Sequence, residues 1–586
     1  MKYHPRLFTP QYIIGAFLVT ILPMLFLSRP VDPFMGFLVV LPYLIFCSSV
    51  LGAWILPSEH NIWRMLFGAI GLCSLFSIIL SAVYWFFRID IWVIQTVLAL
   101  IPLTIGFLPK QNDNAHERMA KLITMEKGEI SESGVPLMLL RLAAIGGDIL
   151  LFATLLSRRY GDTLISPWTI LGPKFFLMFF LTSVLLFFVF QKTPKNRINH
   201  APQGYMVNLP FLVLHATLML SVALILFKNG FGFDPFIHHA AEEWILAHGV
   251  ILPKQPYYIG QYMLAILISA LFHLPIASVD AGLVPIFAGI LFPAMAFFAF
   301  VQKQYAAKLL PALLLMFFIP LNFFTATTPN NLALLYAALC IFWMWYETEY
   351  GTIQTHIFGL LLAGAALAVH PFIGVPLVIA YLGFLAIQAQ RSKPLGVAIA
   401  VAVFLCMVFA LPALFFVNAE RSGDALALQS PIATIGQFLT LFKRPFWEWI
   451  DKAPIPPLQW KMLYWYKSAI KPIAVLAAIA GFFLLQKKYK EQRAWYFLLC
   501  AGALFVSSFL LATTIKFPNV ITYEQGVYAD RLLEFSLIFL VPFFLIATNE
   551  LFKKIEAQKR SVPLISMLFA AILLISWYFT YPTRDP

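Results

Sequence analysis

The chain has 586 residues, of which 61% are hydrophobic and 11% are charged, and its formal net charge is +13. A soluble protein would carry about a quarter charged residues, so the composition excludes a soluble globular enzyme. The positive charge does not indicate a nucleic-acid-binding protein, because the basic residues lie mainly in short loops, where they report membrane topology. The predicted partner is therefore the lipid bilayer, not nucleic acid.

Apolar runs of the length that a transmembrane helix requires, roughly 17–25 residues, recur along the whole chain. They predict an all-α, polytopic transmembrane bundle. The five cysteines lie inside such runs, so no disulfide framework is expected. In chain order the candidate spans are 10–28, 34–56, 64–87, 91–108, 136–157, 166–190, 207–227, 258–275, 281–301, 306–325, 331–347, 353–369, 372–390, 394–417, 469–486, 494–513, 532–549 and 562–580.

Basic loops predict the orientation of these spans, because cytoplasmic loops carry an excess of lysine and arginine. With the five strongest basic clusters inside, the loop 228–257 is external. An odd number of crossings must then follow it before the next basic cluster, although two apolar segments intervene. The first of them, the tyrosine-rich segment 258–275, is therefore predicted to be a re-entrant or interface-lying helix. The five clusters are 192–197, 303–308, 391–393, 487–493 and 553–560.

This arrangement gives about 17 crossings, each of the length that a bilayer requires. It also predicts a cytoplasmic N-terminus and an external C-terminus, with the cell membrane as the location. The external pair Arg158 and Arg159 is an exception to the charge rule.

Two parts are expected. Residues 1–200 form an N-terminal transmembrane block of about six spans to which no role is assigned, and residues 201–586 carry the chemistry. The segment 109–135 between the fourth and fifth spans is expected to be a cytoplasmic helix and linker. Arg141 and Asp148 lie seven residues apart on one helix face. They predict either an intramembrane pair or an arginine that extends to the interface.

The segment 229–262 gathers ionisable residues between runs that are otherwise nearly free of charge, as a functional site in a membrane protein would. Asp234 follows two glycines and precedes Pro235, a pattern that predicts the start of a helix. Asp234 is either the N-cap of that helix or also a general base, made more basic by partial desolvation at the bilayer boundary. The ionisable residues are Asp234, His238, His239, Glu242, Glu243, His248 and Lys254.

The pairs His238/Glu242 and His239/Glu243 are each four residues apart, so each pair shares a helix face. They support the site either as plain surface pairs or as part of a metal centre. A divalent cation held by Asp234, His238 and Glu242 is one hypothesis. The chain has no HExxH motif, and surface His–Glu pairs are common.

Phosphate-binding candidates lie at the same predicted face. Lys254 would meet a phosphate or remain at the headgroup level, and Tyr257 and Tyr258 follow it. His370 ends a span before Pro371 and is either a structural or a ligand-binding group. Arg531 begins a helix, where the helix dipole disfavours a cation. This misfit indicates an anionic partner, which is either a lipid phosphate or a local carboxylate, Glu524 or Asp530.

The external loop 418–468 is rich in tryptophan and tyrosine. Such a density beside a membrane is typical of an interface-lying helix, and the rings could alternatively stack on sugars.

From residue 207 onward the chain resembles the GT-C superfamily of polyprenyl-phosphate-dependent glycosyltransferases. The resemblance rests on the external loop with its early acid, Asp234, on the helices 236–248 and 258–275 that follow, and on the outward His370-Pro371 and Arg531. It implies that Asp234 is the catalytic residue. The next external loop, 325–331, has no carboxylate, whereas many members place a second acid there.

The resemblance implies a sugar transferred from a polyprenyl-phosphate donor to a hydroxyl of a glycan, lipid or protein acceptor on the external face. Asp234 would accept the hydroxyl proton in a single inverting displacement, and Arg531 or Lys254 would stabilise the departing phosphate. A transporter or lipid flippase is the main alternative hypothesis, and a polymerase or ligase of lipid-linked glycans is the second.

Overall fold

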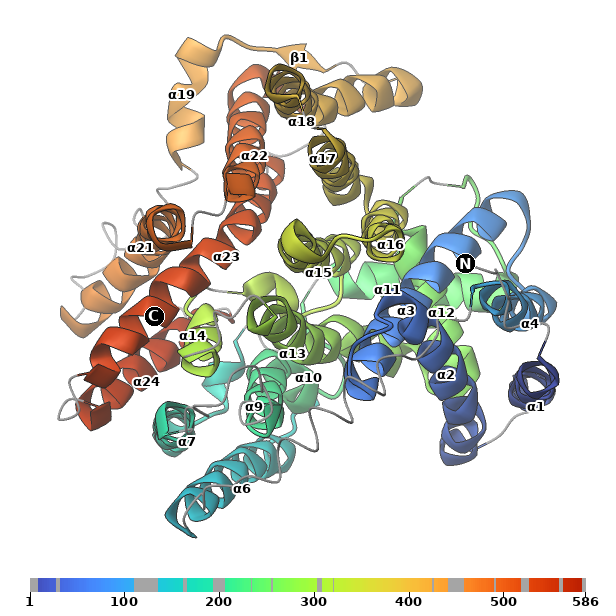
Figure 1. The fold of residues 1–586 in the computed structure, drawn as a ribbon, viewed down its shortest axis with the longest axis horizontal. Helices are drawn as coiled ribbons and strands as arrows, with labels where there is room; N and C mark the ends of the chain where they lie inside the picture. The colour runs from blue at the N-terminus through green and yellow to red at the C-terminus, as the bar shows by residue number, and fades with distance from the viewer. Residues whose placement is uncertain are drawn as a thin grey trace.

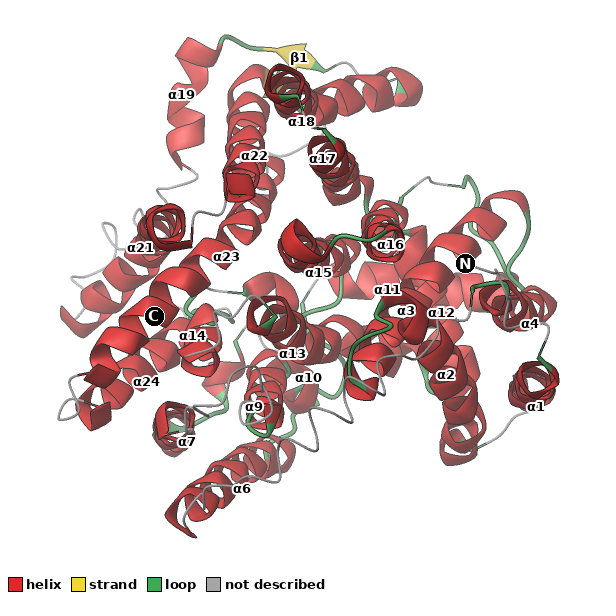
Figure 2. Ribbon diagram, viewed as in Figure 1, coloured by secondary structure: helices red, strands yellow, loops and turns green. Residues whose placement is uncertain are grey.

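The computed structural model describes residues 9–27, 32–109, 135–161, 166–192, 206–232, 234–254, 257–302, 308–319, 321–390, 392–423, 426–440, 458–489, 492–517, 526–557 and 562–581. Almost every described element is a helix (Figure 2). The only strands among these residues are β1 (Ala427–Leu428) and β2 (Ile515–Lys516), which pair antiparallel. The segment 110–134 and the tryptophans at 447 and 449 lie outside the described residues.

The helices follow the apolar runs. They are α1 (Pro10–Leu27), α2 (Pro33–Ile55), α3 (Asn61–Phe86), α4 (Ile91–Gly106), α6 (Val135–Ser157), α7 (Pro173–Lys192), α9 (Leu209–Leu220), α10 (Val222–Leu226), α11 (Asp234–His248), α12 (Ile259–Phe272), α13 (Ile276–Val301), α14 (Leu309–Met316), α15 (Pro329–Tyr350), α16 (Ile353–Val369), α17 (Pro371–Ala389), α18 (Lys393–Ser422), α19 (Pro431–Thr440), α21 (Leu458–Tyr489), α22 (Trp495–Thr514), α23 (Val527–Ala557) and α24 (Val562–Tyr578). Three short 3₁₀ turns accompany them: η2 (Pro167–Thr169), η4 (Asn322–Phe324) and η5 (Gln492–Ala494).

The predicted all-α membrane bundle is confirmed. Within the described ranges, 11 helices are long and apolar enough to cross a bilayer, so the chain is a multi-pass membrane protein. Not every predicted span is one continuous helix. The span 306–325 contains the short α14, which ends at Met316 before Pro320, a residue without an N–H donor, and the 3₁₀ turn η4. The span 166–190 contains η2, and α7 starts only at Pro173. The span 207–227 is divided at Ser221 into α9 and α10.

Helix starts follow a local rule that can be read in the sequence. Asp32, Thr328 and His370 each accept a hydrogen bond from a backbone N–H in the first turn, and a proline follows each of them. A side-chain acceptor satisfies a donor that the helix leaves unpaired, and proline at the first helical position loses no hydrogen bond.

Helix ends gather at two opposite ends of the bundle. At the first end, backbone and side-chain hydrogen bonds join Lys254 to Tyr84, Tyr160 to Leu226, Tyr258 to Val369 and Gln429 to Thr514. At the opposite end they join Gln302 to Glu59, Lys308 to Gln191, Arg493 to Thr348 and Lys488 to Glu550.

Helix α12 is held by other helices at both of its ends, and the re-entrant or interface-lying placement expected for this segment stays a prediction. Its start is fixed by the hydrogen bond from Tyr258 N to Val369 O. Its last residue, Phe272, packs against Gly36 at the start of α2, so closely that a Cβ at position 36 would lie 3.0 Å from the Phe272 carbonyl oxygen. Helix α12 has 14 residues, and 11 of them are buried. An apolar helix buried by its neighbours in this way needs no contact with lipid.

The bundle has two apolar cores. Helices α1–α4 pack together with α11 and α12 around one core, and most of the remaining helices share the other. Helices α1–α4 lie on the opposite side of the molecule from α21, α23 and α24, with α13 and α15 between them (Figure 1). Helices α6 and α7 pack instead against α9, α24 and each other. The division at residue 200 remains a prediction.

Candidate functional site

The acidic loop forms a turn followed by a helix at the first end of the bundle. Gly230 and Gly232 have φ angles of 97° and 90°, which only glycine adopts without strain. Helix α11 then begins at Asp234, and the predicted helix 236–248 is confirmed. The Asp234 carboxylate lies in the first turn, where the helix dipole favours a negative charge. It is exposed on the protein surface, so the expected desolvation is not provided by neighbouring protein groups.

A row of rings connects α11 to the start of α17. The imidazole of His238 lies 5.2 Å from the Tyr258 ring, and the Tyr258 ring lies 5.1 Å from the imidazole of His370, measured between centroids. His238 Nδ1 is also 2.9 Å from the hydroxyl oxygen of Tyr262. Tyr258 has a left-handed backbone with a φ of 75°, and its N–H donates to Val369. The segment after the acidic loop therefore meets the His370-Pro371 turn directly.

Arg531, from the first turn of α23, contributes its charge to the same group. Burial lowers the pKa of His238 to about 4, with Asp234 opposing and Arg531 assisting the shift. Burial also lowers the pKa of His370 to about 3, and Arg531 and His238 lower it further. Burial raises the pKa of Tyr258, with opposing contributions from Tyr528 and Arg531 among its neighbours. Both imidazoles are consequently neutral at pH 7.

Residues from four separate segments therefore form one group, which we call the histidine–arginine cluster: Asp234, His238, Tyr258, His370 and Arg531. The sequence expectation that His370 and Arg531 lie near Asp234 agrees with this geometry. The predicted roles of these residues stay predictions.

Lys254 and Tyr257 differ in their placement. The ammonium of Lys254 donates to the carbonyl oxygens of Tyr84, Trp85 and Phe87 at distances of 2.7, 3.0 and 3.3 Å. These carbonyls belong to the C-terminal end of α3, where a cation is favoured. The three N–H donors of Lys254 are thus directed at a helix end, and its predicted phosphate contact stays untested. Tyr257 is half-buried, with its ring 4.9 Å from that of Tyr258.

The two His–Glu pairs of α11 are not equivalent. His239 Nε2 lies 3.1 Å from Glu243 Oε1 without hydrogen-bond geometry, and Glu243 is exposed. Glu242 is fully buried, and its Oε1 accepts a hydrogen bond from Gln261 Nε2, which also donates to Asp280 Oδ1. Burial and the nearby Asp280 carboxyl raise the pKa of Glu242 well above its usual value. A buried pair of carboxyl groups bridged by one amide was not predicted.

The predicted three-residue metal site does not fit α11. Asp234 and Glu242 are eight residues apart on a regular helix, which separates them by about 12 Å along its axis. Ligand oxygens must lie about 2 Å from the ion, so the two side chains cannot reach the same ion. Within the part of the chain that the structure describes, no group of three or more His, Cys, Asp and Glu side chains could hold a metal. A divalent cation elsewhere stays an untested prediction.

A cavity of about 570 Å³ adjoins the opposite face of α11. It is bounded by α6, α10, α11, α13 and the loop around Ala326. Pro235 and Phe236, which directly follow Asp234, line it, as do Arg159 and Lys228. Asp234 itself is not among the lining residues, so the cavity begins one residue after it on α11.

Three polar pairs between helices were not predicted, because their partners lie far apart in the sequence or on separate helices. His215 of α9 lies 2.7 Å from Asp148 of α6 through Nδ1 and 3.1 Å from Ser183 of α7 through Nε2. Asp148 is thus paired with His215 and not with Arg141. At the opposite end of the bundle, the buried Glu347 accepts a hydrogen bond from Tyr381 and lies 2.9 Å from His356.

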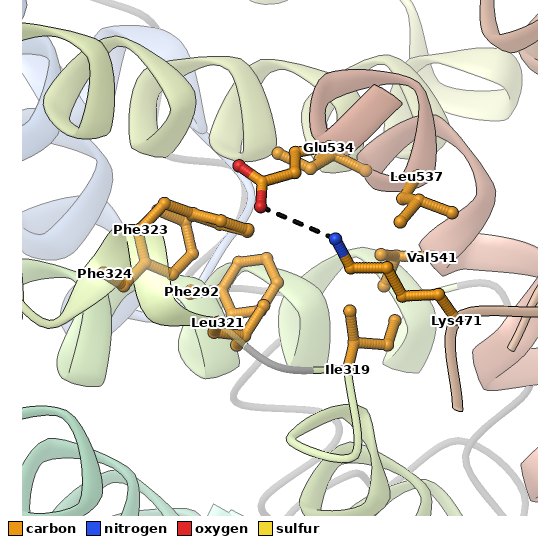
Figure 3. A pocket seen from close by; sticks show the side chains of 10 residues that line it. Phe292, Ile319, Leu321, Phe323, Phe324, Lys471, Glu534, Leu537 and Val541 are labelled. Carbon is orange, nitrogen blue, oxygen red and sulfur yellow. Dashed lines mark ion pairs between the residues drawn. The ribbon is translucent and has the colours of Figure 1, made fainter. Parts of the chain in front are cut away.

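The third pair is an ion pair between two candidate spans. Lys471 of α21 and Glu534 of α23 are 3.7 Å apart, beside a small cavity of about 10 Å³. Figure 3 shows the pair next to the rings of Phe292 and Phe323. Charged groups inside membrane segments are costly and usually have a role.

Comparisons of the chain with protein-family models, with curated proteins and with solved structures find no match.

Proposed function

We propose that the chain is an integral membrane glycosyltransferase that moves a sugar from a polyprenyl-phosphate donor to an acceptor hydroxyl. The observation that supports it best is the histidine–arginine cluster. An exposed carboxylate, two neutral imidazoles and a guanidinium come from three segments and meet at one end of an apolar bundle. A lipid-linked sugar presents its phosphate at the same level of the membrane.

The reaction is a single inverting displacement. The acceptor oxygen attacks the anomeric carbon while its O–H proton passes to the Asp234 carboxylate. The bond between the anomeric carbon and the phosphate oxygen breaks, and the polyprenyl phosphate leaves with the bonding electron pair. Arg531 stabilises the departing phosphate, because a planar guanidinium binds two phosphate oxygens at once. His238 and His370 are neutral and hence serve as hydrogen-bonding groups for the sugar or phosphate.

The topology in this proposal has about 17 crossings, with the first end of the bundle outside the cell membrane and the N-terminus in the cytoplasm. Helix α12 does not cross. The burial of 11 of its 14 residues among other helices supports this placement. Thiol labelling of Asn229→Cys and Lys393→Cys from outside tests this arrangement. Labelling at position 229 alone is expected, and labelling of both would refute it.

The proposed activity is tested with the purified full-length protein and a set of polyprenyl-phosphate sugars. Consumption of a donor, with release of polyprenyl phosphate and loss of this activity in Asp234→Asn, is expected. Undiminished transfer by Asp234→Asn would show that the catalytic assignment is wrong.

A transporter or lipid flippase is the second candidate. The ion pair Lys471–Glu534 and the pair Asp148–His215 favour it, because both lie in apolar helices where a substrate path would need polar groups. In proteoliposomes this candidate predicts translocation of a labelled lipid that is lost in Lys471→Met, with no donor consumed. Donor consumption that persists in Lys471→Met would instead favour the transferase.

A further inference from the structure

Three cations on opposite sides of α11 suggest two anion sites. Arg531 belongs to the histidine–arginine cluster, whereas Arg159 and Lys228 line the 570 Å³ cavity on the other face of the helix. Resting on the proposed function, we propose that this cavity binds the acceptor, and that the acceptor is an anionic phospholipid with a free headgroup hydroxyl.

The backbone holds the two cavity cations together. Tyr160 N donates to Leu226 O at 2.8 Å, and Lys228 N donates to Tyr160 O at 3.0 Å. These two bonds form a parallel bridge between Tyr160 and Phe227, which places Arg159 beside Leu226 and Lys228 beside Gly161. Asn229 Nδ2 adds a bond to Gly161 O. The two backbone segments that carry the cations are thus fixed against each other, and both cations line the cavity.

The sequence supplies an independent reason for these cations to matter. Arg158 and Arg159 lie on the side of the membrane where basic residues are unexpected, and short loops rarely keep such an exception without a partner. The structure separates the two arginines, because Arg159 lines the cavity and Arg158 is not among its lining residues. An anionic partner held in the cavity accounts for Arg159.

The remaining lining fits an acyl chain. Phe152 and Leu156 of α6 and Leu224 of α10 give the cavity an apolar wall. Phe152 and Leu156 are exposed on the protein surface, where lipid chains would lie, so a lipid can enter sideways. The wall is held in place because α6 is tied to α7 and α9 through Asp148, His215 and Ser183.

The position of the headgroup follows from the depths of the charges. Arg159 and Lys228 are exposed, whereas the one carboxylate that lines the cavity, Asp280, is 2% exposed and accepts a hydrogen bond from Gln261. A phosphate at the cations avoids Asp280. A hydroxyl beyond that phosphate lies toward the wall formed by Pro235 and Phe236, the two residues that follow Asp234. In this proposal the hydroxyl reaches the Asp234 carboxylate around the start of α11.

The test measures lipid binding without catalysis. Full-length Asp234→Asn protein in phosphatidylcholine nanodiscs is titrated with fluorescent phosphatidylglycerol. We expect saturable binding that weakens about fivefold for each of Arg159→Gln and Lys228→Gln, since a membrane-surface cation contributes about 1 kcal/mol. Arg158→Gln, the matched control, changes the affinity less than about twofold on the same scale. Ala277→Trp, which fills the cavity from its exposed wall, also weakens binding.

Three results would overturn the proposal: unchanged binding in the Arg159→Gln/Lys228→Gln double variant, an equal loss in Arg158→Gln, or unchanged binding in Ala277→Trp. Undecaprenyl phosphate is added as a competitor. If it displaces phosphatidylglycerol and its own binding depends on Arg159, the cavity is the donor site and the acceptor assignment is wrong. Because no turnover is needed, intact lipid binding with no transfer from any donor would count against the proposed function alone.

Discussion

Replacing Lys254 by methionine separates two roles of this residue. Its ammonium donates to three carbonyl oxygens at the end of α3, and it lies in the segment that joins the acidic loop to α12. If the lysine caps α3, the substitution loosens the ends of α3 and of the acidic loop together. If it binds the donor phosphate, the substitution weakens donor binding instead.

The size of the capping effect follows from the three contacts. A hydrogen bond from a charged group contributes about 1.5–3 kcal/mol when it is buried. Two of the three carbonyl contacts are exposed, so water replaces most of their energy when the ammonium is removed. The 2.7 Å bond to Tyr84 is partly buried and retains most of its value. The total loss is about 2 kcal/mol, which corresponds to about 30-fold more frequent local opening.

Hydrogen exchange of peptides from residues 84–90 and 249–254 measures that opening directly. Lys254→Met is expected to accelerate exchange there about 30-fold, while Lys174→Met, an exposed lysine at the start of α7, leaves it unchanged. The reasoning is refuted if exchange at both segments stays at the wild-type rate while the KM for the donor rises tenfold or more.

Glu242→Gln is expected to raise Tm at pH 8 and to have little effect near pH 4. Burial raises the pKa of Glu242, so below about pH 4.5 its carboxyl group is protonated in the folded and unfolded states and does not destabilise the fold. As pH rises toward the folded-state pKa, keeping this carboxyl group buried lowers the stability, and the glutamine avoids that loss. His370→Asn keeps the cap on α17 but removes a group whose pKa is lowered to about 3. Because the unfolded state binds a proton at His370 below about pH 6.5 and the folded state does not, acid destabilises the wild-type protein. Thermal scans of the variant should therefore show a smaller loss of Tm than the wild type as pH falls. An unchanged pH profile in either variant contradicts its assignment. Arg531→Gln should raise the donor KM at least about tenfold and leave phosphatidylglycerol binding intact. Weaker binding of both the donor and phosphatidylglycerol would show that the two ligands share one anion site.

The sequence predicts most of the fold because the strongest signals are local. Apolar length defines the spans, and proline after a capping side chain defines starts such as Pro33 and Pro371. The division of 207–227 at Ser221 was not predictable, since every residue around it is apolar and helix-compatible. Packing against other helices decides such breaks.

The candidate site was predictable where topology alone constrains it. Counting crossings brings Asp234, His370 and Arg531 to one end of the bundle, and the structure places them within electrostatic reach of His238. The contacts of Lys254 with α3 depend on how that end packs, which no spacing in the sequence reveals.

The buried pairs escaped prediction for a different reason. Lys471 and Glu534 are 63 residues apart, and neither spacing nor composition links them. His215 and Asp148 are separated in the same way, by 67 residues. Only the packing of one helix against another creates such pairs.

The central claim is that Asp234 is the base that takes the acceptor proton. Asparagine keeps the size of the side chain and favours a helix start almost as well, so α11 should remain folded in Asp234→Asn. Single-turnover transfer from a polyprenyl-phosphate sugar is the most direct measurement, with Asp90→Asn, the N-cap of α4, as the matched control. The account predicts a rate reduced about 10²–10⁴-fold in Asp234→Asn and unchanged in the control. Transfer at the wild-type rate by Asp234→Asn would contradict it.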